Sequence, residues 1–189
     1  YTGHMHDPTL STAQHRELIE ALAHSHVLPH DTLPVEECLG RRLAIDVRSL
    51  IPLPPFTNSA MDGFAVRRED LAGEGPWTLP VAGDIPAGDT RDNRLEAGQA
   101  WRIMTGAPIP AGADTVVKVE QTDHAAGIAQ APETVEIRVA PKLGENVRVA
   151  GEALAAGSPV LEAGRVLDGA ALAAATSVGH GTLTVLPRP

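Results

Sequence analysis

The chain has 189 residues, 43% of them hydrophobic and 21% charged, so it can bury a globular core and is not a disordered tail. Its 15 Lys and Arg residues against 24 Asp and Glu give a formal net charge of −9, which has the wrong sign for binding a nucleic-acid backbone. No apolar run approaches the roughly 20 residues of a membrane span and no signal-peptide order is visible, so we expect a soluble cytoplasmic protein with no nucleic-acid or membrane partner.

The N-terminal region predicts one helix. Tyr1–His4 read as a cloning scar and are set aside. Ser11-Thr12-Ala13-Gln14 has the form of a capping box, and apolar residues then recur at helical spacing at Leu18, Ile19 and Leu22. We therefore expect a helix over residues 12–25. Its apolar stripe is narrow, so the helix needs another surface to lie on.

A short helix and a strand are expected next. Residues 33–40 read as a helix that opens at Pro34 and stops at Gly40, and residues 43–51 read as a strand. The prolines at 52, 54 and 55 then favour an extended connector. Cys38 is the only cysteine, which excludes an internal disulfide and a thiolate zinc site, and we expect it to be buried.

The stretch from 52 to 147 predicts a β-rich lobe, because short strand candidates alternate there with turn clusters and helical periodicity is absent. The candidates are residues 63–66, 77–81, 100–104, 115–120 and 134–139. Strands of this length indicate a small barrel or sandwich.

The C-terminal region predicts strand, helix and strand at residues 160–161, 170–177 and 182–186, with Asp168 capping the helix and Gly179 ending it. The fold class is therefore α+β and β-rich. We expect a leading segment, residues 1–27, and a mixed α/β lobe, residues 28–50 and 148–189. The β-rich lobe, residues 51–147, is inserted into the mixed lobe.

Two segments could carry chemistry. In residues 54–65 a stiff proline stretch is followed by Thr57-Asn58-Ser59 and by Asp62-Gly63, a loop that can present one carboxylate and several hydrogen-bonding groups. In residues 103–114, Thr105-Gly106 follows a strand and lets backbone N–H groups approach an oxyanion. The plain alternatives are polar side chains that satisfy their own backbone in the first segment and a rigid strand connection in the second.

A third group holds Arg148, Gly151 and Glu152. The arginine could bind a phosphate, and the glutamate could hold a metal through waters, but a solvated charge pair is the common alternative. No serine or cysteine lies in a legible pattern with a histidine, so hydrolysis by a nucleophile has no support.

Together these segments resemble the N-terminal part of the molybdopterin molybdenumtransferase family, which includes the E domain of gephyrin. The resemblance runs through Leu33-Pro34-Val35, Leu39-Gly40-Arg41, the Pro-x-Phe-x-Asn-Ser-Ala-Met-Asp-Gly run at 54–63, Ala87-Gly88, residues 103–114, Val116-Val117 with Glu120, and Arg148 with Gly151-Glu152. It covers nearly the whole chain, and the 54–63 and 103–114 runs are long and specific.

The resemblance implies an elongated β-rich lobe inserted into a mixed α/β lobe, followed by a large α/β domain and a small β domain that are missing here. It implies that the leading helix packs on the missing domain. It also implies a reaction that inserts molybdenum from molybdate into adenylated molybdopterin and releases AMP. It further implies that magnesium or another divalent cation assists this reaction and that the active site lies between the subunits of a homodimer.

By motif position, the resemblance makes Asp62 and Thr105 catalytic and assigns substrate binding to Asn58, Ser59, Gly63, Gly106 and Arg148. It assigns the metal to Asp62 and Glu152. We expect the fragment alone to be inactive, because half of the site is missing. The family commonly has the motif Arg-x-x-Gly-Glu-Asp at residues 148–153, but in this chain the last position of the motif is Ala153. That departure keeps a second interpretation open, a divergent non-catalytic binding or assembly module of the same fold.

Overall fold

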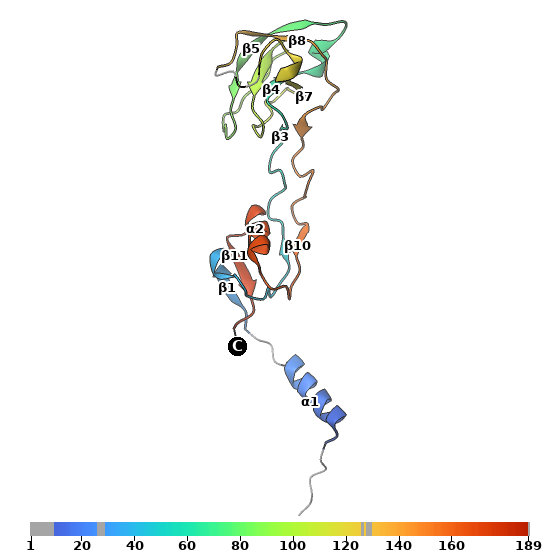
Figure 1. Ribbon diagram of the computed structural model, residues 1–189, viewed down its shortest axis with the longest axis vertical. Coiled ribbons are helices and arrows are strands. Elements are labelled where there is room, and N and C mark those ends of the chain that lie inside the picture. Colours follow the sequence, from blue (N-terminus) through green and yellow to red (C-terminus); the bar gives the residue numbers. More distant parts are fainter. Residues whose placement is uncertain (1–9, 26–28, 126, 128–129, 189) are drawn as a thin grey trace, which may run out of the picture. The chain divides into compact units, whose positions relative to one another are not determined.

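A computed structural model describes residues 10–25, 29–125, 127 and 130–188, so the expected scar at Tyr1–His4 lies outside the described residues. The chain forms two compact units, which are drawn in Figure 1. Unit 1 comprises residues 1–47 and 160–189, and unit 2 comprises residues 48–159. From the sequence, the two boundaries between the mixed α/β lobe and the β-rich lobe are expected after residues 50 and 147. The second boundary lies later in the structure because residues 151–158 are hydrogen bonded to residues 49–54 within unit 2.

Helix α1 (Thr12–Ser25) confirms the predicted helix and its capping box. The Ser11 amide donates to Gln14 Oε1 at 2.9 Å, and the Gln14 amide donates to Ser11 Oγ at 3.3 Å. The apolar side chains of the helix are more than half exposed, at Leu18, Ile19 and Leu22. Neither this helix nor any other described helix is long and apolar enough to cross a membrane.

Replacing Ser11 with Ala is expected to destabilise the start of α1 by about 1 kcal/mol, because the first-turn amide of Gln14 then loses its acceptor. Amide hydrogen exchange in the first turn measures the effect, which appears as faster exchange at Gln14. Thr12→Ala is the matched control, since it leaves both capping hydrogen bonds in place. Equal exchange in Ser11→Ala and the unmodified chain would contradict the capping role.

Unit 1 contains a small antiparallel sheet in which β1 (Asp31–Pro34) pairs with β11 (Thr182–Val185). The helix expected at residues 33–40 is wrong, because Leu33 and Pro34 belong to β1 and only a 3₁₀ turn, η1 (Val35–Glu37), follows. The strand expected at residues 43–51 is also largely wrong. Only β2 (Val47–Arg48) is a strand there, and it pairs with β10 (Pro159–Leu161).

Helix α2 (Gly169–Ser177) lies beside β1 and β11 in Figure 1 and completes the core of unit 1. It begins one residue before the predicted start, and Asp168 caps it as predicted. Cys38 is fully buried, as expected, and this burial raises the pKa of its thiol. The buried apolar side chains of unit 1 are Val35, Cys38, Leu43, Val47, Leu161, Leu167, Ala171, Ala175, Val178, Leu183 and Val185.

The cap of α2 predicts a pH-dependent stability. Asp168 Oδ1 accepts a hydrogen bond from the Ala171 amide at 2.7 Å, and this bond, helped by Arg165, lowers the pKa of Asp168. Because the pKa is lower in the folded state, the stabilisation is fully present above the unfolded pKa of about 3.9 and is lost as the pH falls through the folded pKa. We expect Asp168→Ala to destabilise α2 more at pH 7 than near pH 2.

Hydrogen exchange of the Ala171 amide at both pH values measures this difference. Asp168→Asn is the control, because it keeps an acceptor that does not titrate. A loss of protection in Asp168→Ala that is equal at pH 7 and pH 2 would show that the carboxylate charge does not matter.

Unit 2 is built on a five-stranded sheet in the order β7–β4–β6–β5–β8. The pair β5–β6 is parallel and the other pairs are antiparallel. A bridge between Thr122 and Ile137 joins the chain beyond β7 to β8, so the sheet curls toward closure. The strands are β4 (Gly63–Val66), β5 (Trp77–Ile85), β6 (Ala100–Ile103), β7 (Thr115–Lys118) and β8 (Thr134–Ile137), with 3₁₀ turns η2 (Arg68–Leu71) and η3 (Val119–Gln121).

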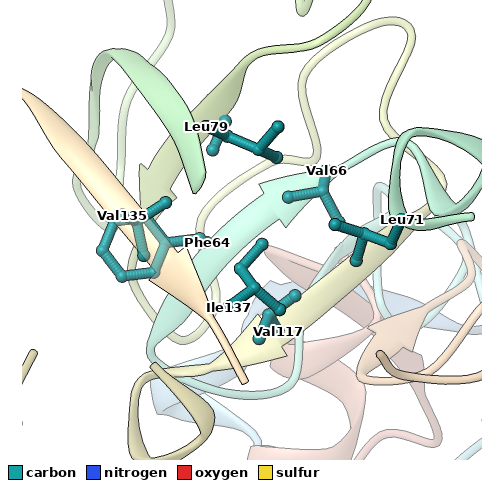
Figure 2. Close-up of a cluster of buried hydrophobic side chains, with 8 residues drawn as sticks. Phe64, Val66, Leu71, Leu79, Val117, Val135 and Ile137 are labelled. Carbon is teal, nitrogen blue, oxygen red and sulfur yellow. The ribbon is translucent and has the colours of Figure 1, made fainter. Parts of the chain in front are cut away.

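Both faces of this sheet are covered. Figure 2 shows the cluster on one face, in which the ring of Phe64 lies with Val66, Leu79, Val117, Val135 and Ile137. The neighbours of Phe64 and Val117 in sequence, Ala65 and Val116, belong to a second cluster with Ile85, Ile103 and Ala107. Since successive side chains of a strand point to opposite faces, this second cluster packs the loop after β6 against the other face.

Candidate functional site

Asp62 and Thr105, one from each predicted segment, are hydrogen bonded to each other. Asp62 Oδ1 accepts from the Thr105 amide and from Thr105 Oγ1, both at 2.7 Å. These bonds, the amide first, lower the pKa of Asp62, burial opposes them, and the charge of Arg102 adds a smaller lowering effect. Asp62 is exposed, and its Oδ2 has no hydrogen-bond partner among the described residues. The site therefore presents an ionised carboxylate with one oxygen open.

The pairing of β4 with β6 explains why these residues meet. The strands run antiparallel with Gly63 opposite Ile103, so the residue before β4 lies close to the chain that leaves β6. Gly106 then adopts a φ of +81°, which favours glycine, and its amide donates to Ser59 O at 2.8 Å. The turn at Thr105-Gly106 is thereby tied to two residues of the first segment, Ser59 and Asp62.

The need for a glycine at position 63 is steric. A Cβ at this position would lie 1.9 Å from the carbonyl oxygen of Val117, because β4 and β7 pass each other closely there. This contact accounts for the glycine without a ligand.

Ser59 is fully buried and serves its own loop. Its hydroxyl donates to Met61 O at 2.6 Å and accepts from the Met61 amide, and its own amide donates to Ala107 O. The neighbouring strands β3 (Asn58–Ser59) and β9 (Val147–Arg148) pair in antiparallel register. Ser59 therefore holds the two segments together and does not present its hydroxyl.

Asn58 differs from Ser59 because part of its side chain is unsatisfied. It is 7% exposed and Nδ2 donates to Phe56 O, but Oδ1 is buried and without a partner in the described part of the chain. A buried acceptor without a hydrogen bond costs about 1–3 kcal/mol. A buried water molecule that donates to Oδ1 would remove that cost.

Among the described residues, Arg148 and Glu152 make no hydrogen bond or ion pair with Asp62 or Thr105. The backbone of Arg148 pairs with Asn58 in β3–β9, and its side chain is exposed. Glu152 Oε2 accepts from the Val149 amide at 3.0 Å, so this carboxylate closes its own turn. Ala153 is exposed, and its amide donates to Leu53 O.

The described residues contain no group of three or more His, Cys, Asp or Glu side chains that could hold a metal ion. No contact described here brings Glu152 to Asp62. A single open carboxylate oxygen does not make a cation site by itself, since even Mg²⁺ is bound through one or two carboxylates together with waters and substrate phosphates.

A pocket of about 40 Å³ lies at the edge of the cluster that contains Phe64, and Asp62, Arg102 and Met104 are among the residues that line it. Arg102 is 6% exposed and its Nη1 lies 3.1 Å from Asp84 Oδ2. The volume suits a few water molecules or one small group, not a pterin or a nucleotide. Sequence reasoning missed Arg102 and Asp84. The available signal was a charged residue within the apolar strand Ala100–Ile103.

Comparison with known proteins gives one consistent relationship. The family described as the MoeA N-terminal region (domain I and II) matches residues 10–179. The chain is 44% identical over 160 residues to molybdopterin molybdenumtransferase 2 of Mycobacterium tuberculosis, covering 83% of this chain and 38% of that protein. It is 38% identical over 173 residues to the molybdopterin molybdenumtransferase of Synechococcus elongatus, covering 89% of this chain and 41% of that protein.

Solved structures agree with this relationship. A crystal structure of a molybdopterin biosynthesis MoeA protein from Pyrococcus horikoshii superposes with a TM-score of 0.79 at 30% identity. The match covers 92% of this chain and 44% of that one. The chain thus spans less than half the length of each of these relatives.

Proposed function

The chain belongs to the family of the MoeA N-terminal region, whose pattern covers residues 10–179, and on this premise we propose that it is part of a molybdopterin molybdenumtransferase. In the proposed reaction adenylated molybdopterin and molybdate are the substrates, the dithiolene sulfurs bind molybdenum, and AMP leaves. The observation that carries the proposal is the Asp62–Thr105 contact, because it joins the two most specific segments of the family at one exposed carboxylate.

The proposed role of Asp62 follows from its charge. A carboxylate whose pKa is lowered is a weak proton acceptor at neutral pH, so a general-base role has little support. We assign Asp62 a positioning role, in which Oδ2 accepts a hydrogen bond from substrate or from an ordered water while Thr105 fixes the carboxylate through Oδ1. The exposed Arg148 would attract the phosphate of the substrate.

The rest of the proposed site comes from outside this chain. The curated relatives cited above are more than twice as long as the matched region. A second part of the enzyme, from the same protein or from the second subunit of a homodimer, would complete the cleft that faces Asp62. The described residues contain no group of three or more metal-binding side chains, and the steps proposed for Asp62 and Arg148 do not depend on a metal.

The test is an assay of the natural protein that carries this chain, with adenylated molybdopterin as substrate. We expect AMP release that depends on molybdate, together with molybdenum bound to the pterin product. Binding of adenylated molybdopterin without AMP release would overturn the enzymatic proposal.

Ala153 favours the second candidate, a non-catalytic binding module. Its turn is otherwise well formed, with Gly151 at a φ of +78° and Glu152 bonded to Val149, and only the carboxylate expected from the family resemblance is absent at 153. Because Ala153 is exposed, Ala153→Asp introduces that carboxylate without disturbing a core. If the Ala153→Asp variant releases AMP and the unmodified protein does not, the natural chain is the binding module.

A further inference from the structure

A second concave surface of unit 2 lies on the far part of the loop that begins at Thr105. It is a groove of about 240 Å³ between residues 91–93 and residues 108–111. The loop wall is continuous with the first segment, because the Ile109 amide donates to Thr57 O at 3.2 Å and Pro108 forms a β-bridge with Asn58. The groove and the Asp62 site therefore share one rigid loop.

The opposite wall is organised by one carboxylate. The Asp89 side chain is only 5% exposed and accepts from the amide and the guanidinium of Arg91, at 2.8–3.0 Å, and from Asn93 Nδ2 at 2.9 Å. Arg91 Nη2 also donates to Asp84 O at 2.7 Å. These bonds hold the pKa of Asp89 well below its usual range, so the wall stays charged and ordered at neutral pH.

What remains open in the groove defines its ligand. The Arg91 side chain is 61% exposed, and Nε and Nη2 donate to Asp89 and to Asp84 O, so Nη1 is left as the open edge of its planar guanidinium. Asp92 is exposed and bonds to none of the residues that the structure describes, and Asn93 has its Oδ1 left as an acceptor. The facing wall is apolar, formed by Pro108, Ile109 and Pro110.

This combination disfavours an anion, because Asp89 neutralises Arg91 and Asp92 repels negative charge. It favours a planar heterocycle that stacks on a guanidinium, packs against proline rings and points N–H donors at a carboxylate. The volume lies below the roughly 300–1,000 Å³ of sites for drug-sized ligands, so one ring system fits better than the whole adenylated substrate.

We propose that this groove binds the pterin ring of the substrate, an inference that rests on the proposed function and adds to it the place of one substrate part. A pterin has an N–H and an amino group side by side, which match the two oxygens of Asp92. An adenine ring offers one amino group flanked by acceptors, which would face the carboxylate unfavourably. The proposal therefore assigns the groove to the pterin end and not to the adenylate end.

The test is a titration of the ¹⁵N-labelled chain with neopterin, followed by NMR. We expect shifts of the amides of Arg91, Asp92, Asn93, Ile109 and Ala111, with a Kd on the order of 1 mM for so small a ligand. Asp92→Asn replaces one oxygen by a donor and should weaken binding at least about tenfold. Arg91→Lys keeps the charge but removes the flat stacking surface, so it should also weaken binding.

AMP at the same concentrations is the competing probe, and Asp123→Asn is the control variant because Asp123 lies outside the groove. Neopterin shifts confined to other amides, equal affinities for the unmodified chain and Asp92→Asn, or a preference of the groove for AMP would each overturn the proposal. This titration involves no turnover. Failure here combined with molybdate-dependent AMP release in the natural protein would refute the pterin groove while leaving the proposed function in place.

Discussion

Asp62→Asn is expected to lower kcat/KM for molybdenum insertion on the order of 100-fold in the natural protein that carries this chain, with little change in its free energy of unfolding. The asparagine oxygen can still accept from the amide and hydroxyl of Thr105, so the turn at Thr105-Gly106 keeps its geometry. What disappears is the negative charge and the second acceptor oxygen. The measurement is steady-state AMP release, with urea unfolding measured in parallel.

Asp123→Asn is the matched control, because Asp123 Oδ1 also accepts a backbone amide, that of Glu136, at 2.9 Å. It should keep full activity. The pH profile adds a second check. Because the pKa of Asp62 is lowered, its charge survives below the usual range of an aspartate, and the acid limb due to Asp62 appears only as the pH falls through that lowered value. Unchanged activity in Asp62→Asn would refute the role of the carboxylate.

The elements that could be predicted are those whose signals are local. Ser11 and Gln14 lie one turn apart, and their two hydrogen bonds start α1 at the predicted residue. Asp168 caps α2 from three residues away in the same manner. The strand β4 also has the predicted bounds, Gly63–Val66, because the Asp-Gly turn ahead of it marks its start.

The elements that were missed depend on partners far along the chain. β1 ends at Pro34, a residue that opens helices as well as it ends edge strands, and its partner β11 begins at Thr182. Only that pairing decides between the two structures. The strands β3 and β9 have two residues each, which leaves no periodicity to read, and they form because Asn58 and Ser59 lie opposite Arg148 and Val147.

The candidate site divides in the same way. The residue types at 58–63 and 105–106 can be read from the sequence, but that Asp62 Oδ1 takes two bonds from Thr105 follows only from the register of β4 and β6. A metal at Asp62 and Glu152 stays a prediction from the resemblance, and Glu152 is bonded to Val149 in its own turn. Polar residues in a loop predict hydrogen bonding, but only the three-dimensional structure determines which of them face a ligand.

Gly63→Ala is expected to destabilise unit 2 by at least about 3 kcal/mol, because overpacking against backbone cannot be relieved by a side-chain rotation. The added Cβ would lie 1.9 Å from Val117 O, 2.9 Å from Val117 C and 3.1 Å from Lys118 Cα. To make room, β4 has to move away from β7. The measurement is urea unfolding followed by tryptophan fluorescence, which reports on unit 2 because Trp77 and Trp101 are the only tryptophans of the chain.

Gly98→Ala separates this steric effect from the conformational freedom of glycine. Gly98 has a φ of +73° and open space around its Cβ position, so alanine there should cost only about 1–2 kcal/mol of backbone strain. A Gly63→Ala protein as stable as Gly98→Ala would contradict the close approach of β4 and β7. If the steric argument holds, Gly63→Ala also displaces Asp62, the preceding residue, from Thr105. Loss of activity in Gly63→Ala then reports a broken sheet, whereas loss in Asp62→Asn with normal unfolding reports a missing charge.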